Sequence, residues 1–150
     1  MNILSGNNYI DNFINIKHCK KNTFSSTNYK NILKDNATGV FYAKAIISKN
    51  SINSEANQSN KNLMLSDKAT IHSNPQLEIY NDEVKCSHGA TTGEIDKDAL
   101  FYMQSRGIKP SDCKKIILEG FSVEITTKIK NTDIKNIITK KINNWFENGN

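Results

Sequence analysis

The sequence predicts a mainly β region followed by a small helical region. Residues 1–95 contain several short apolar runs that alternate with polar residues at a period of two, as strands do. After Asp96 the apolar residues recur at the three- and four-residue spacing of amphipathic helices. The chain has only 2 Pro and 7 Gly, too few for a disordered low-complexity chain. We therefore expect a β domain over residues 1–95 and a helical region over residues 96–150.

Five stretches of the β region have the composition of strands. We expect the polar stretch Ser48–Asn62 and the pair Asn81-Asp82 to be corners between them. No fixed internal period is visible, so the pattern fits a sandwich, a barrel or a β-solenoid. In chain order, the candidate strands are Tyr9–Ile16, Val40–Ile47, Leu63–Leu65, Gln76–Tyr80 and Glu83–Cys86.

Two or three helices are predicted after the β region. Asp96 is a suitable N-cap for the first helix and Gly107 is its stop signal. Ala99, Leu100 and Met103 share one face of this helix. The second helix begins near Pro110-Ser111, with an apolar stripe at Ile116, Ile117, Phe121, Ile125 and Ile129. The third begins at Thr132-Asp133, with a stripe at Ile134, Ile137, Ile138, Ile142 and Trp145.

Composition argues against several classes of function. The formal net charge is +5, but 19 of the 20 basic residues are Lys and only Arg106 is Arg. Proteins that read nucleic acid rely heavily on Arg, so nucleic-acid binding is disfavoured. No apolar run approaches the length of a membrane span, and no signal peptide is recognisable. Three cysteines without regular spacing indicate free thiols in a reducing cytoplasm.

Cys86 and His88 form the most distinctive candidate site. If the strand continues through them, both side chains leave the same face. A thiolate and an imidazole suit iron or zinc, but they supply at most half of a tetrahedral site. The remaining ligands must then come from elsewhere in the chain, as in a small metal-binding or redox protein, or from a partner. Spacing alone favours a simpler interpretation, a buried structural cysteine beside a histidine at the turn.

Other chemistry-bearing patterns are weak. The sequence contains no glycine-rich phosphate loop, no dinucleotide fingerprint, no zinc-protease motif and no nucleophile elbow. The run Leu100–Met103 is apolar all round. It is either an exposed partner surface or a helix covered on both sides.

Several longer motifs resemble the SufB/SufD family of scaffold proteins in SUF-type iron–sulfur cluster assembly, and the SufD type in particular. The resemblance extends over roughly residues 18–146. Its first matches are a serine segment at Phe24–Ser26 and a YKGVL-like strand at Asn28–Leu33. Family members carry an N-terminal domain and many more β-helix turns before this region. The motifs with the greatest likeness are Asn57–Ser66, Pro75–Tyr80, Val84–Thr91, Leu100–Tyr102 and Ser105–Gly107.

The resemblance implies a right-handed parallel β-helix followed by helices. It implies a non-catalytic scaffold that pairs with a SufB-like subunit and docks the SufC ABC-type ATPase. His88, and less strongly Cys86, would help to hold a transient iron–sulfur cluster shared with the partner. Phe101, Tyr102 and Arg106 would contribute to the ATPase-facing surface. The rival expectation is a shortened interaction module that docks the ATPase without supporting cluster assembly.

Overall fold

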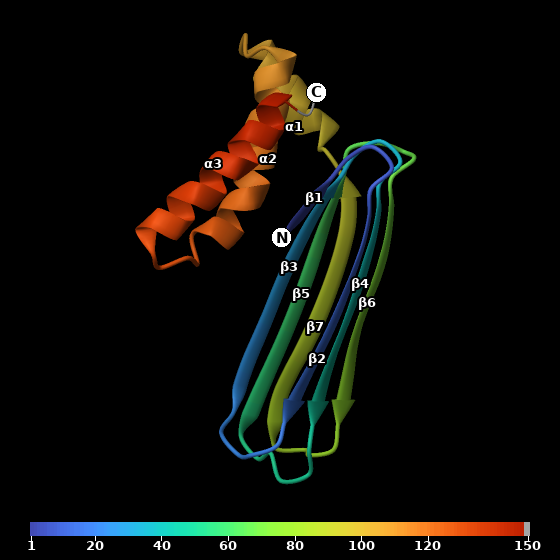
Figure 1. Ribbon diagram of the computed structural model, residues 1–150, viewed down its shortest axis with the longest axis vertical. Helices are drawn as coiled ribbons and strands as arrows, with labels where there is room; N and C mark the ends of the chain where they lie inside the picture. The colour runs from blue at the N-terminus through green and yellow to red at the C-terminus, as the bar shows by residue number, and fades with distance from the viewer. Residues whose placement is uncertain (149–150) are drawn as a thin grey trace. The chain divides into compact units, whose positions relative to one another are not determined.

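Seven strands precede three helices in the computed structural model, which describes residues 1–148 (Figure 1). The chain divides into two compact units, Met1–Gly93 and a second that begins at Glu94. The first unit contains β1 (Asn2–Leu4), β2 (Tyr9–His18), β3 (Phe24–Leu33), β4 (Thr38–Ile47), β5 (Ser54–Met64), β6 (Thr70–Ile79) and β7 (Val84–Glu94). The helices are α1 (Lys97–Ser105), α2 (Pro110–Thr126) and α3 (Thr132–Asn148).

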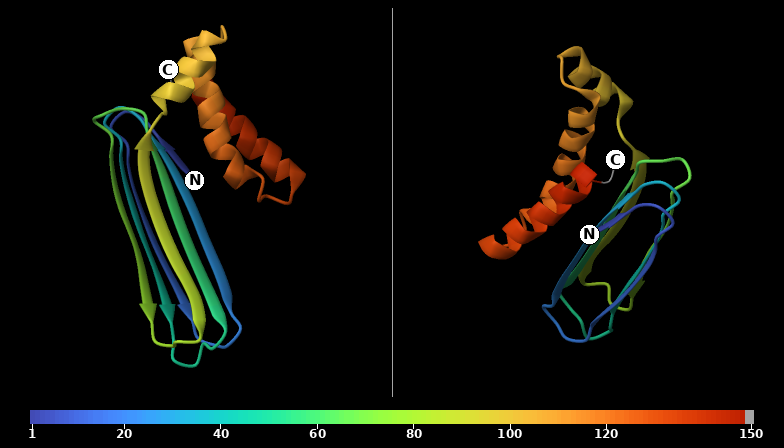
Figure 2. Two further views of the ribbon diagram at one scale, coloured as in Figure 1. Left: turned by 180° about the vertical axis from the view of Figure 1, so that it is seen from behind. Right: turned by 45° about the horizontal axis from the view of Figure 1, so that its top comes forward.

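The first unit is a parallel β-helix, which confirms the predicted fold class. Successive strands alternate between two sheets, one with the order β1-β3-β5-β7 and the other with the order β2-β4-β6. Every strand pair with an assigned register is parallel, with partners 29 to 32 residues apart, such as Asn2 with Asn31 and Thr38 with Thr70. Figure 2 shows the two layers from further directions. The repeat is hard to see in the sequence because most equivalent positions carry different side chains, although the triplet Asn2-Ile3-Leu4 recurs at Asn31-Ile32-Leu33.

Strand β4 supplies the apolar side of the interior. Its residues alternate strictly, and Phe41, Ala43, Ala45 and Ile47 are all buried. The two alanines are small, which lets the facing layers approach closely. The predicted strand Val40–Ile47 is therefore confirmed, with its start two residues earlier.

Strand β5 corrects the prediction that Ser48–Asn62 is only a polar corner. Residues Ser54 to Met64 form a full strand whose inward positions include Gln58, Asn60 and Asn62, each at most 5% exposed. Sequence patterning failed here because it assigns inward positions to apolar residues. In this solenoid, polar side chains occupy those positions, and those of Asn60 and Asn62 bond to each other.

A ladder of asparagines crosses the four-stranded sheet. Asn2 Nδ2 donates to Asn31 Oδ1 at 2.9 Å, and Asn31 Nδ2 donates to Asn62 Oδ1 at 2.6 Å. Asn62 Nδ2 continues the ladder to Thr92 Oγ1 at 3.3 Å and to the Thr91 carbonyl oxygen at 3.1 Å. Buried amides are costly unless they are paired, so only this register satisfies them.

The turns repeat as regularly as the strands. Asn22 and Asn53 both adopt positive φ, near 58° and 55°, as asparagine tolerates better than most residues. Their backbone N–H groups donate to carbonyls of the next turn, Ile52 at 2.9 Å and Glu83 at 2.8 Å. The same end of the solenoid buries His18, whose two ring nitrogens bond to Thr23 and Ser25 hydroxyls at 2.6 and 2.8 Å.

Both predicted ends of the first helix and the predicted start of the second are confirmed, but α2 ends at Thr126, so Ile129 of the predicted stripe lies beyond it. The Asp96 side chain accepts hydrogen bonds from Asp98 N and Ala99 N, as an N-cap does. Gly107 adopts a φ of 84°, the left-handed conformation of a helix stop. Helix α2 starts at Pro110, where proline is well suited because the N–H it lacks has no helical partner.

Helices α2 and α3 form an antiparallel pair, seen side by side in Figures 1 and 2. Lys115, near the start of α2, pairs with Glu147, near the end of α3, at 2.8 Å. This contact raises the pKa of Lys115 through its hydrogen bond to Glu147.

The predicted apolar stripes of α2 and α3 are only partly buried. Ile116 of α2 is 48% exposed and Ile137 of α3 is 58% exposed, whereas Ser122 and Ile142 are buried.

Among the described residues, the helices are too short or too polar to cross a membrane.

The asparagine ladder can be tested by truncating one member. We expect Asn62→Ala to lower the free energy of unfolding by about 2–3 kcal/mol, because the buried Asn31 and Asn60 amides lose partners. Urea unfolding followed by circular dichroism in the β region measures this change. Asn74→Ala is the matched control, since Asn74 is exposed on β6. Equal effects of the two substitutions would contradict a stabilising ladder.

Candidate functional site

Cys86 and His88 both lie on β7, one of the two edge strands of the four-stranded sheet. Position 86 faces the interior, since Val84 and Cys86 pack against the buried cluster of Ala45, Ile47 and Ala56. Because side chains alternate along a strand, His88 lies on the same face as Cys86. The predicted pair is therefore brought together on one face of one strand.

The two side chains differ in accessibility. Cys86 is half-buried, and burial raises the pKa of its thiol, an effect that a hydrogen bond with the Ala56 backbone partly opposes. His88 is exposed, as are the residues of β7 that follow it. The three-stranded sheet ends at β6, and within the described chain no strand follows β7 to cover this interior-facing side. The imidazole is thus accessible, whereas the thiol is largely protonated and partly covered near neutral pH.

The described residues contain no group of three or more His, Cys, Asp and Glu side chains that could hold a metal ion. Cys86 and His88 therefore bring at most two donors to a shared site. Soft thiolate and borderline imidazole donors suit iron.

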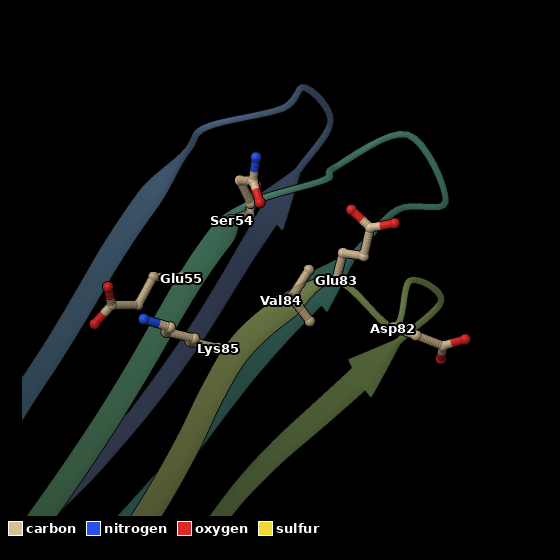
Figure 3. A pocket seen from close by; sticks show the side chains of 7 residues that line it. Ser54, Glu55, Asp82, Glu83, Val84 and Lys85 are labelled. Atoms are coloured by element: carbon tan, nitrogen blue, oxygen red, sulfur yellow. The ribbon is translucent and has the colours of Figure 1, made fainter.

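A separate pocket of about 450 Å³ lies beside the starts of β5 and β7 (Figure 3). Six of its seven lining residues are polar or charged, and neither Cys86 nor His88 lines it. Figure 3 shows Asp82 and Glu83 on the connection into β7 and Glu55 and Lys85 on the strands. The lining residues are Asn53, Ser54, Glu55, Asp82, Glu83, Val84 and Lys85.

The three residues expected on the ATPase-facing surface belong to α1 and its C-cap. Phe101 is 73% exposed and Tyr102 is 60% exposed. The Arg106 guanidinium lies 5.1 Å from the centroid of the Tyr102 ring and donates to Tyr102 Oη at 3.1 Å. Ala99, Leu100 and Met103, the predicted shared face, are the partly buried residues of the helix. Aromatic rings and Arg at an accessible position are typical of partner surfaces.

Two buried polar atoms next to the site were not anticipated from the sequence. Gln58 Oε1 and Asn60 Nδ2 are buried on the inward face of β5 and have no hydrogen-bond partner among the described residues. A signal was available, because Gln58, Asn60 and Asn62 recur at a spacing of two. Such alternation marks one face of a strand whether the residues are polar or apolar.

The accessibility of the thiols can be measured by alkylation. At pH 8 in the native state, we expect Cys86 to react with iodoacetamide more slowly than Cys19, because Cys86 is half-buried with a raised pKa and Cys19 is exposed. Its rate should continue to increase with pH above the ordinary thiol range. Mass spectrometry of peptides gives the two rates, and both cysteines should react alike in urea. Native rates that are equal would contradict the described burial.

Comparison with known proteins places this geometry in a family. The chain matches the SufBD core domain of the SUF system for FeS cluster assembly over residues 1–121. It is 34% identical over 134 residues to the iron–sulfur cluster assembly protein SufD of Escherichia coli, covering 89% of this chain and 32% of that protein. A SufBD family protein of Synechocystis is 39% identical over 101 residues, covering 67% of this chain and 22% of the relative.

The SufD protein of Bacillus subtilis is 30% identical over 115 residues, covering 74% of this chain and 26% of that protein. This chain thus spans a third or less of the length of these curated relatives. The matched region contains the seven described strands, the Cys86–His88 pair and α1. The chain belongs to the SufBD core domain family of iron–sulfur cluster assembly.

Proposed function

We propose that this chain is a non-catalytic scaffold subunit of SUF-type iron–sulfur cluster assembly. In this role it pairs with a SufB-like subunit, shares a nascent cluster with it, and docks a SufC-like ABC ATPase. The cluster is cargo, assembled and passed on. The observation that carries the proposal is the exposed imidazole of His88 on the uncovered face of β7, within the matched family domain.

The chemistry assigns unequal roles to the two candidate ligands. His88 can present a ring nitrogen to iron without displacing any part of the core. Cys86 must first lose its proton, which the raised pKa of its half-buried thiol opposes. His88 is therefore the principal ligand from this chain, and the remaining ligands come from the partner. A two-donor face on an edge strand supports such sharing, because the edge also offers unpaired backbone groups to a neighbouring chain.

The helical unit supplies the ATPase-docking surface in this proposal. The side chains of Phe101 and Tyr102 are accessible, and Arg106 lies against the Tyr102 ring. An aromatic pair with an adjacent Arg has the composition of an interface hot spot.

The proposed location is a reducing cytoplasm. All three cysteines are free thiols, in keeping with such a compartment.

A second candidate function is ATPase docking without cluster assembly. The observation that favours it is that Cys86 and His88 together offer only two donors, with no larger ligand group among the described residues. The same observation disfavours an independent metal-binding or redox protein, which would need further ligands from this chain.

The cluster role predicts a specific loss on substitution of His88. In anaerobic reconstitution with iron, sulfide, a SufB-type subunit and a SufC-type ATPase, we expect His88→Ala to lower the visible cluster absorbance by about tenfold. His72→Ala is the matched control, because His72 is also exposed but lies on β6. Pull-down of the partners should be unchanged by either substitution.

The outcomes separate the two functions. Retained ATPase binding with cluster absorbance that does not depend on His88 would support the docking module. Failure to bind either partner would contradict both functions.

The docking surface can be tested on its own. We expect the double substitution Phe101→Ala, Tyr102→Ala to weaken ATPase binding by about tenfold or more, because exposed aromatic rings dominate such interfaces. Titration calorimetry with the ATPase measures the dissociation constant. Phe24→Ala is the control, since Phe24 is 67% exposed on β3. An unchanged constant for the double variant would exclude α1 from the interface.

A further inference from the structure

Gln58 is a buried glutamine whose hydrogen bonding is incomplete. It faces the interior of the β-helix from β5 and is 5% exposed. Its Nε2 donates to the Gln76 carbonyl oxygen at 3.3 Å, but its Oε1 has no partner among the described residues. A buried acceptor without a donor is expensive, so a donor is expected nearby.

The register between β5 and β7 identifies the residue opposite Gln58. Ser87 Oγ donates to Asn57 Oδ1 at 2.7 Å on the outer face, and Asn62 Nδ2 donates to Thr92 Oγ1 at 3.3 Å on the inner face. Both pairs are 30 residues apart in sequence. The offset between the paired residues is the same on both sides of His88, so β7 has no bulge between Ser87 and Thr92.

His88 therefore lies opposite Gln58, and both face inward. Neighbouring strands are separated by about 4.8 Å, a spacing that a histidine ring and a glutamine amide bridge easily. The imidazole is exposed, so its ring is free to turn toward β5. A neutral histidine always carries one N–H donor, which matches the missing partner of Gln58 Oε1.

We propose that Gln58 positions His88, with its buried Oε1 accepting the N–H of one ring nitrogen so that the other nitrogen presents its lone pair at the open side of β7. The assignment deepens the scaffold role proposed above and rests on it for its functional meaning. A histidine that binds a metal commonly donates its second nitrogen to a carbonyl-type acceptor, which fixes the tautomer.

The surroundings of His88 favour this partner over an ionic one. The inward side chains of β5 near it are Ala56, Gln58 and Asn60, none of them charged. The opposing strand β6 contributes Ser73, Pro75 and Leu77 from its inward positions, and β7 itself contributes Cys86. Within the described chain, Gln58 Oε1 is the acceptor atom in this group whose bonding is unsatisfied.

The tautomer of His88 can be read directly by NMR. In the full chain labelled with ¹⁵N at about pH 8, which is above the reference pKa of histidine in model peptides, long-range ¹⁵N–¹H spectra distinguish protonated from unprotonated ring nitrogens. We expect one dominant tautomer for His88, and a shift of roughly two- to tenfold toward the other tautomer in Gln58→Met. His72, exposed on β6, is the internal reference and should not change.

A matched control makes the same chemical change elsewhere. Gln76→Met replaces a glutamine whose side chain accepts from Tyr42 Oη at 2.6 Å on the outer face, and it should leave His88 unchanged. Equal tautomer ratios of His88 in the unsubstituted chain and Gln58→Met would overturn the proposal. If Gln58→Met does not fold, a His88 tautomer mixture like that of His72 in the unsubstituted chain would overturn it equally.

This measurement needs no iron, sulfide or partner. Tautomer ratios of His88 that do not depend on Gln58 would therefore contradict this proposal but not the scaffold role. A failed cluster reconstitution would contradict the scaffold role but not the tautomer assignment.

Discussion

Parallel stacking of strands in one register is the constraint on which the β-helix unit depends. The ladder from Asn2 through Asn31 and Asn62 to Thr92 holds this register, because shifting any strand by one residue would point its amides outward and leave buried partners unpaired. Ala43 and Ala45 are buried and small, which allows the two layers to lie close together. The polar interior therefore specifies the fold as well as stabilising it.

The same register positions the two candidate ligands on the last strand. Strand β7 extends the four-stranded sheet, so its inward positions inherit the alignment of β5. Val84 and Cys86 pack against the core, whereas His88 lies on the uncovered part of the face. One strand thus combines an anchored segment with an accessible one. Such an arrangement holds an imidazole at a defined place while it remains available to a partner.

The two candidate ligands, Cys86 and His88, differ in how deeply they are buried, and we therefore expect different roles for them. A thiol that is packed against Ala56 is held in its neutral form by desolvation, so Cys86 contributes mainly to packing near neutral pH. The imidazole of His88, by contrast, is exposed. The nearby buried Gln58 Oε1 gives the ring a partner that can orient it. Orientation matters because a metal ion requires a lone pair from one specified nitrogen.

The sequence by itself determined the β-then-helix order, the caps at Asp96 and Gly107, and the Cys86–His88 pair, because alternation, capping chemistry and family motifs are local. It indicated only the apolar end of β5, near Leu63–Leu65, because the inward residues Gln58 and Asn62 are polar and their burial depends on strands about 30 residues away. Only the tertiary structure decided that Cys86 is half-buried while His88 is exposed. Cys86 still packs against the buried cluster of the β-helix, whereas His88, two residues further along β7, does not. No local sequence pattern encodes this difference.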